Sequence, residues 1–151
     1  MKTNYENPTI GLSAFSDSAI EEATINIAKA NDSEQIGGYG LNNNAFLRRL
    51  KYDTKVTAIA PSAMVNCRSI LTSLHLPGTL TSIGNAAFAE FSETFPRLMD
   101  VNFNGCASLR TIGDYAFYNS ISTLQDSTLS LHSNLTSIGT AAFAYDRTSW
   151  T

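Results

Sequence analysis

Three side chains have the types found in the catalytic triads of hydrolases. Ser130 could act as a nucleophile, His75 as its general base, and Asp100 as the carboxylate that orients the imidazole. His75 and His132 are also candidate ligands for a metal ion. Both kinds of chemistry need their groups within bonding distance of one another. The outcome therefore depends on the elements that carry these residues.

A six-residue phrase, Ile-Gly-x-x-Ala-Phe, recurs along the chain. Full copies are Ile10–Phe15, Ile83–Phe88, Ile112–Phe117 and Ile138–Phe143, and weaker copies are Ile36–Leu41 and Ile59–Met64. The isoleucines that open the phrases are 26, 23, 24, 29 and 26 residues apart. A repeat of this length predicts a solenoid, in which each coil buries one apolar face against the next coil.

A second repeated element, Leu-x-x-Leu-x-Leu, lies between the phrases. Its copies are Leu71–Leu76, Leu47–Tyr52 and Leu98–Phe103, while Ile25 with Ile27 and Leu129 with Leu131 keep only the last two apolar positions. Alternation of apolar and polar residues predicts a short strand with one buried face. We expect the strands of successive coils to pair in a parallel sheet. The segments of variable length after each phrase are expected to form loops on the convex side.

Three positions of the phrase have predicted structural roles. The glycine at the second position is expected to adopt a backbone angle that is costly for other residues. The small residue at the fifth position should let neighbouring coils approach closely. The large apolar residue at the sixth position should fill the core, where an aromatic ring buries roughly 150–250 Å².

The stretch Leu71–Phe88 resembles the repeat of the BspA-like leucine-rich repeat family, which runs Leu-x-x-Ile-x-Leu-Pro-x-x-Leu-x-x-Ile-Gly-x-x-Ala-Phe. Leu109–Phe117 and Leu135–Phe143 match the second half of that pattern. The resemblance covers about five and a half units from Asn7 to Phe143, with units that start near residues 7, 33, 56, 80, 109 and 135. It indicates a single repeat domain over residues 1–151, which is either the whole protein or a segment of a longer one.

The resemblance implies an α/β-type repeat solenoid. Its expected form is a right-handed leucine-rich-repeat coil of about 5–6 units, with short parallel β-strands on the concave face. Loops and short helical turns are expected on the convex side. Members of the family are mostly cell-surface proteins of mucosal bacteria and protozoa, with roles in adhesion and host contact. One departure is that many family units carry Cys three residues after the Phe position, where this chain has only Cys67.

The composition agrees with one soluble domain. The 151 residues are 43% hydrophobic and 15% charged, with a net charge of −3. The only basic patch, Arg48, Arg49 and Lys51, is too small for a nucleic-acid interface. No apolar run is long enough to insert into a membrane. Residues 1–6 do not resemble a secretory signal, so the chain is expected to be either cytoplasmic or a segment of a longer secreted or cell-surface protein.

The repeat keeps the chemical candidates apart. Coils stack about 4.7–4.9 Å apart, so His75 and Ser130, two coils apart, are separated by roughly 10 Å. A nucleophile and its base need about 2.6–3.2 Å. The same spacing separates His75 from His132. Cys67 and Cys106 occupy different columns and are expected to be buried and reduced. The sequence therefore predicts a non-enzymatic protein with no cofactor and no metal site.

The remaining candidate site is the concave face, whose outward positions follow from strand alternation. The predicted binding residues are Thr24, Asn26, Arg49, Lys51, Ser73, His75, Asp100, Asn102, Thr128 and Ser130. We expect this face to bind a protein partner, such as a host extracellular-matrix or epithelial protein, as part of an adhesin-like surface or secreted protein. One alternative is an intracellular scaffold or regulatory protein. A second is a module that self-assembles end to end through an exposed apolar coil.

Overall fold

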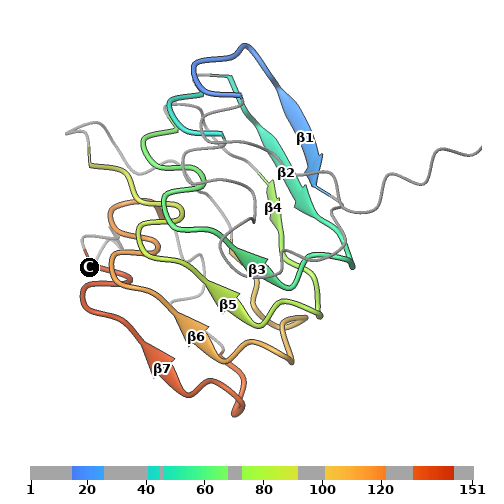
Figure 1. The fold of residues 1–151 in the computed structure, drawn as a ribbon, viewed down its shortest axis with the longest axis vertical. Coiled ribbons are helices and arrows are strands. Elements are labelled where there is room, and N and C mark those ends of the chain that lie inside the picture. The colour runs from blue at the N-terminus through green and yellow to red at the C-terminus, as the bar shows by residue number, and fades with distance from the viewer. Residues whose placement is uncertain are drawn as a thin grey trace, which may run out of the picture.

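The computed structural model describes a chain of short strands joined by turns (Figure 1). The described residues are 15–25, 41–44, 46–67, 73–91, 101–121 and 131–144. The strands are β1 (Glu22–Ile25), β2 (Arg49–Tyr52), β3 (Ala58–Ile59), β4 (Ser73–His75), β5 (Ser82–Ile83), β6 (Thr111–Ile112) and β7 (Ser137–Ile138). No helix occurs within these ranges, so none is long and apolar enough to cross a membrane there.

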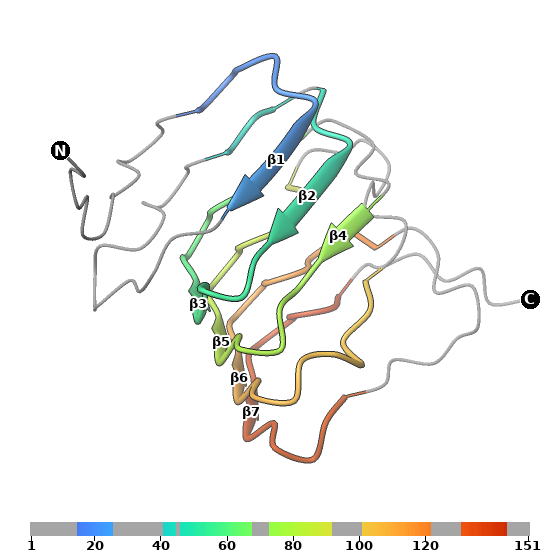
Figure 2. The ribbon, with the colours of Figure 1, turned by 90° about the vertical axis from the view of Figure 1, so that its right-hand side faces the viewer.

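The strands form two parallel sheets, each built from one strand per repeat. One sheet has the order β1-β2-β4, and a parallel bridge from Leu74 to Val101 continues it into the next repeat. The other sheet has the order β3-β5-β6-β7. Figure 2 shows the two sheets along different sides of the same stack of repeats. The predicted short parallel strands are therefore confirmed, whereas the handedness of the coil stays a prediction.

The second sheet is formed by the phrase itself, which the sequence had indicated only as a turn. The isoleucine that opens each of the last three phrases ends a two-residue strand, and the amide of the following glycine continues the pairing. Gly84 N–H donates to the Ile59 carbonyl at 2.9 Å, and Gly113 N–H donates to the Ile83 carbonyl at 2.8 Å. The phrase therefore contributes to the pairing of repeats as well as to the change of direction.

The second half of the phrase is a turn, and the short helical turns expected on the convex side do not occur among the described residues. Its fourth position is left-handed in four repeats, with φ of 56° at Ser62, 53° at Ala86, 57° at Tyr115 and 52° at Ala141. A left-handed residue interrupts the right-handed helical conformation. No glycine among the described residues has a positive φ. The predicted conformational role of the phrase glycine is therefore wrong.

The phrase glycine is required for close approach between repeats. A Cβ atom on Gly113 would lie 2.6 Å from the Asn85 backbone nitrogen. On Gly139 it would lie 2.5 Å from the Gly113 carbonyl carbon. Real Cβ atoms essentially never approach backbone atoms this closely. The second position is thus small because backbone atoms of the preceding repeat occupy the space.

The large residues at the sixth position of the phrase fill the core, as predicted. Met64 is 3% exposed, Phe88 is 5% exposed and Phe117 is fully buried. The Phe88 and Phe117 rings stack at 5.0 Å, and the Phe117 and Phe143 rings stack at 5.3 Å. Phe15, in the first described repeat, differs because 40% of its surface is exposed. The ring column therefore holds the later repeats together and is incomplete at its start.

Candidate functional site

The exposed face of the β1-β2-β4 sheet carries side chains in two columns that run across the strands. The strand register places Glu22 beside Arg49 in the first column, and Arg49 pairs with the strand position of Ser73 on β4. It places Thr24, Lys51 and His75 in the second column, about 4.8 Å from strand to strand. The bridge between Leu74 and Val101 brings Asn102 next to His75 in the following repeat. We call these two columns the β1-β2-β4 face.

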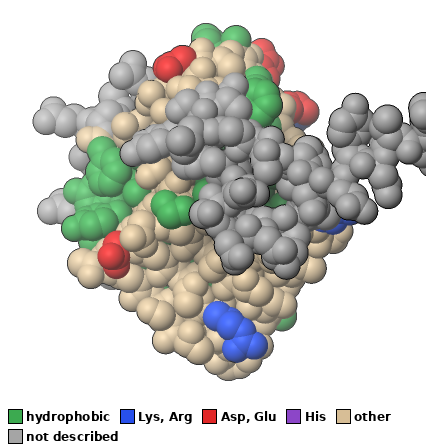
Figure 3. All heavy atoms as spheres, viewed as in Figure 1, with side chains coloured by type: hydrophobic (Ala, Val, Ile, Leu, Met, Phe, Trp, Pro, Cys, Tyr) green, Lys and Arg blue, Asp and Glu red, His purple; other side chains and the backbone are tan. Residues whose placement is uncertain are grey.

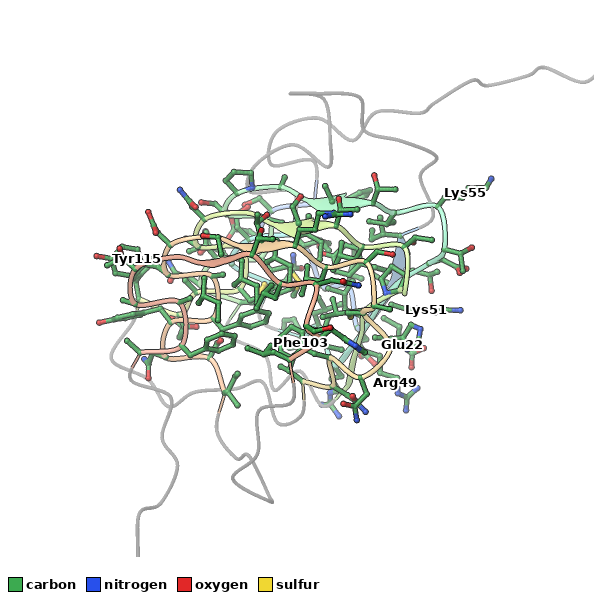
Figure 4. The ribbon with its side chains drawn as sticks, turned by 90° about the horizontal axis from the view of Figure 1, so that it is seen from below. Glu22, Arg49, Lys51, Lys55, Phe103 and Tyr115 are labelled. Carbon is green, nitrogen blue, oxygen red and sulfur yellow. The ribbon has the colours of Figure 1, made fainter. Side chains whose placement is uncertain are left out.

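Strand alternation separates this face from the core. Along β2 the burial pattern runs exposed, buried, exposed, buried, because Leu50 and Tyr52 point into the core. The side chains of Arg49 and Lys51 on the other face keep 67% and 50% of their surface exposed. Figure 4 shows that both extend away from the repeats into solvent. The face therefore presents solvent-exposed cationic groups on a strand whose other side packs in the core.

The register of the first strand differs from the prediction by two residues. The repeated strand pattern aligns Ile25 with Leu50, which would place Thr24 beside Arg49. In the structure Glu22 aligns with Arg49, and Ile25 aligns with Tyr52 in the core. Ile25 faces the core in either register, because a shift of two residues keeps the alternation, whereas the observed register brings the Glu22 carboxylate to the Arg49 guanidinium. Opposite charges at neighbouring positions could have indicated this alignment.

Both cations of the face have a carboxylate beside them. Arg49 forms an ion pair with Glu22, and Lys51 Nζ lies 3.7 Å from Asp53 Oδ2. The hydrogen bond from the Thr54 amide, helped by the nearby Lys51 and His75, holds the pKa of Asp53 below its usual value. Exposed ion pairs of this kind contribute about 0–1 kcal/mol. Such weak pairs can exchange for the charges of a partner at little cost.

Several predicted site residues do not join the described part of this face. Asn26, Asp100, Thr128 and Ser130 lie outside the described residues. Of the three candidate catalytic residues Ser130, His75 and Asp100, only His75 lies in the described part of the chain, where it is exposed on β4. Within the described ranges, no three residues of His, Cys, Asp or Glu lie close enough together to hold a metal ion.

The two cysteines are free and belong to the interior of the repeats. The Cys67 thiol donates to the Leu41 carbonyl at 3.0 Å, and burial raises its pKa to about 12. Cys106 is 1% exposed, and burial also raises its pKa. Both groups are therefore protonated at neutral pH. A protonated, buried thiol is a poor nucleophile, so these residues pack the core.

The fold and its exposed face can now be compared with known proteins. The model of the BspA type leucine rich repeat region matches six copies over residues 8–149. No curated protein and no solved structure gives a match. The six matched copies cover nearly the entire chain and agree with the six phrases and with the pairing of successive repeats. The chain therefore belongs to the family of BspA-type leucine-rich repeats.

Proposed function

We propose that this chain is a non-enzymatic protein-binding module of a cell-surface or secreted adhesin-like protein. The β1-β2-β4 face would form the contact surface. Leucine-rich repeat regions generally mediate protein–protein interactions, and BspA-like repeats are commonly associated with the cell surface. The observation that carries the proposal is the exposure of the Arg49 and Lys51 side chains on a face whose opposite side is core.

The chemistry of the face favours a partner with carboxylates. Arg49 offers a planar guanidinium that can hold a carboxylate through two parallel hydrogen bonds. Lys51 adds a second cation two residues along the same strand, and His75 lies beside it on β4. Because the strands are held by parallel pairing on both sides of β2, these groups have a fixed backbone position. A fixed backbone lowers the entropy lost on binding.

The test is binding of the purified chain to extracellular-matrix and epithelial surface proteins by surface plasmon resonance. The variant Arg49→Glu/Lys51→Glu reverses the charge of the face. We expect the Kd to rise about tenfold or more, equivalent to about 1.4 kcal/mol. The affinity of the unchanged chain should also fall as salt is raised, because exposed charges are screened.

A matched control separates the face from the net charge. Lys55→Glu/Arg110→Glu changes the net charge by the same amount at exposed cations outside the β1-β2-β4 sheet. The control should keep the affinity of the unchanged chain. An equal loss in both variants would show a general charge effect, and equal affinity in all three proteins would count against this face. If the folded chain binds none of these proteins, an intracellular scaffold becomes the better interpretation.

Self-association is a second candidate because β7 lies at the edge of its described sheet. Ile138 is 46% exposed, whereas Ile83 and Ile112, at the same position of the phrase, are 1–2% exposed. A strand edge with an exposed apolar side chain can pair with another strand. Sedimentation over a range of concentrations tests this. A rising average mass that Ile138→Lys abolishes would support pairing through β7, and a constant monomer mass would exclude it.

A further inference from the structure

An aromatic cluster lies far from the β1-β2-β4 face, on the turns of two neighbouring phrases. It consists of Phe91, after the β5 phrase, and Tyr115 and Tyr118, in and after the β6 phrase. The ring centroids are 6.4 Å apart for Phe91 and Tyr115, 5.4 Å for Phe91 and Tyr118, and 5.7 Å for the two tyrosines. We call these three residues the aromatic corner.

The aromatic corner is open to solvent. Phe91 is 52% exposed, Tyr115 is 41% exposed and Tyr118 is partly exposed. Figure 3 shows hydrophobic side chains gathered at the edge of the molecule where these turns lie. In Figure 4, Tyr115 lies at the opposite side of the molecule from Arg49, Lys51 and Lys55. A ligand on the corner would therefore not touch the cationic face.

The stacking of repeats does not require large rings at these positions. The position of Tyr115 holds Ala86 and Ala141 in the adjacent repeats, and the position of Tyr118 holds Ala89 and Ala144. The position of Phe91 holds Ser120 in the next repeat. These neighbours close the same turns with small side chains. The rings of the corner therefore add exposed apolar surface that the fold can do without, which is a feature of interaction sites.

The turn that carries Tyr115 and Tyr118 is fixed by its backbone. The φ of 57° at Tyr115 is the left-handed conformation that Ala86 and Ala141 also have at the fourth position of their phrases. The hydrogen bonds from Tyr118 N–H to the Tyr115 carbonyl, at 3.1 Å, and from Glu90 N–H to the Tyr118 carbonyl, at 2.9 Å, hold this turn in place. The rings are thus arranged before any ligand arrives.

The charge around the corner selects the kind of partner. Asp114 directly precedes Tyr115, and its Oδ1 is held by the Thr140 amide at 2.7 Å. The cations of the described part of the chain all lie outside the phrases; they are Arg48, Arg49, Lys51, Lys55 and Arg110. The faces of aromatic rings carry negative potential and attract cations. Three exposed rings, with an acidic residue next to Tyr115 in the sequence and with the described cations outside the phrases, complement a positively charged group.

We propose that the aromatic corner is a second docking surface, and that it receives an arginine or lysine side chain from a basic segment of a protein partner. The cation would lie over an exposed ring face, within about 6 Å of the ring centroid, as in other cation–π contacts. The Asp114 carboxylate, at the neighbouring position, would add charge attraction. This surface is independent of the β1-β2-β4 face, so one module could contact two segments of a partner.

The test is a titration with a short glycine–serine peptide that carries arginines, in which the backbone amide chemical shifts of the chain are monitored by NMR, a signal that the corner variant retains. The corner variant is Phe91→Ser/Tyr115→Ala/Tyr118→Ala, which installs the residues of adjacent repeats and is therefore expected to fold. Its melting curve checks this. The control, Phe46→Ser, removes a ring that is 54% exposed elsewhere on the molecule.

We expect the Kd for the arginine peptide to rise about five-fold or more in the corner variant and to stay unchanged in the control. A control peptide has glutamine in place of arginine. Its binding to the unchanged chain should be as weak as the binding of the arginine peptide to the corner variant. Equal binding of both peptides would refute the cation contact. An unchanged Kd in a folded corner variant would refute the site. Concentration-dependent dimers that the corner variant abolishes would identify a second copy as the occupant and overturn the proposal. Arg49→Gln/Lys51→Gln should leave the Kd for the arginine peptide unchanged. The proposal for the aromatic corner and the proposal for the β1-β2-β4 face can therefore be refuted independently.

Discussion

Gly113→Ala is the most direct test of why the phrase carries glycine. The added Cβ would lie 2.6 Å from the Asn85 backbone nitrogen and 2.7 Å from the Gly84 carbonyl carbon, in the preceding repeat. Backbone atoms cannot rotate away as a flexible side chain would. The two repeats must therefore separate locally, which weakens the hydrogen bond from Gly113 N–H to the Ile83 carbonyl, now 2.8 Å.

The expected cost follows from overpacking a well-packed interior. Such changes destabilise by about 1–3 kcal/mol. Replacing glycine by alanine also stiffens the unfolded chain, which offsets about 0.4–1 kcal/mol. The net loss in the free energy of unfolding is then about 1–2 kcal/mol. For a domain of this size, we expect the Tm to fall by about 2–8 °C, measured by circular dichroism during heating.

Gly105→Ala is the matched control. A Cβ at Gly105 meets nothing within 4 Å, and this glycine does not have a positive φ. The substitution should therefore leave the Tm unchanged or raise it slightly. Gly113→Asn adds a further distinction because asparagine tolerates the left-handed conformation. If space is the reason for glycine, asparagine must cost at least as much as alanine. A neutral Gly113→Ala, or an asparagine variant clearly milder than alanine, would refute the close-approach explanation.

Two further predictions concern the core. Phe117→Ala should lower the free energy of unfolding by about 3–5 kcal/mol, because it removes the central ring of the stacked column. Phe15→Ala should lower it by about 1 kcal/mol or less, because that ring is 40% exposed. Urea unfolding of both variants measures the two losses, and equal losses would contradict the proposed role of the column. Burial raises the pKa of Cys67 from 9.0 to about 12. Between these two pH values the thiol stays protonated in the folded chain, whereas it is deprotonated in the unfolded chain. The contribution of the Cys67 thiol to stability is therefore present below about pH 9 and is lost at about 1.4 kcal/mol per pH unit above it, in addition to any loss from Cys106, whose pKa burial also raises. Cys67→Ala should flatten this fall between pH 9 and 10, and an unchanged slope would show that the thiol does not contribute.

The repeat was readable from the sequence because its signals are local and recur. The apolar alternation of Arg49–Tyr52 predicts a strand with one buried face, and the structure has that strand with Leu50 and Tyr52 in the core. The sixth position of the phrase was predicted to fill the core, and Phe88 and Phe117 do so. Such positions depend on hydrophobicity and spacing, which a single repeat already contains.

What only the tertiary structure decided is how one repeat meets the next. The register of β1 places Glu22 beside Arg49, although the two residues are 27 positions apart in the sequence. Position 113 requires glycine because backbone atoms of the preceding repeat leave no space for a Cβ atom, and not because of its own φ. The aromatic corner exists because stacking brings Phe91 of one repeat beside Tyr115 and Tyr118 of the next. Sequence patterns record what each repeat buries, whereas contacts across repeats exist only once the repeats are stacked.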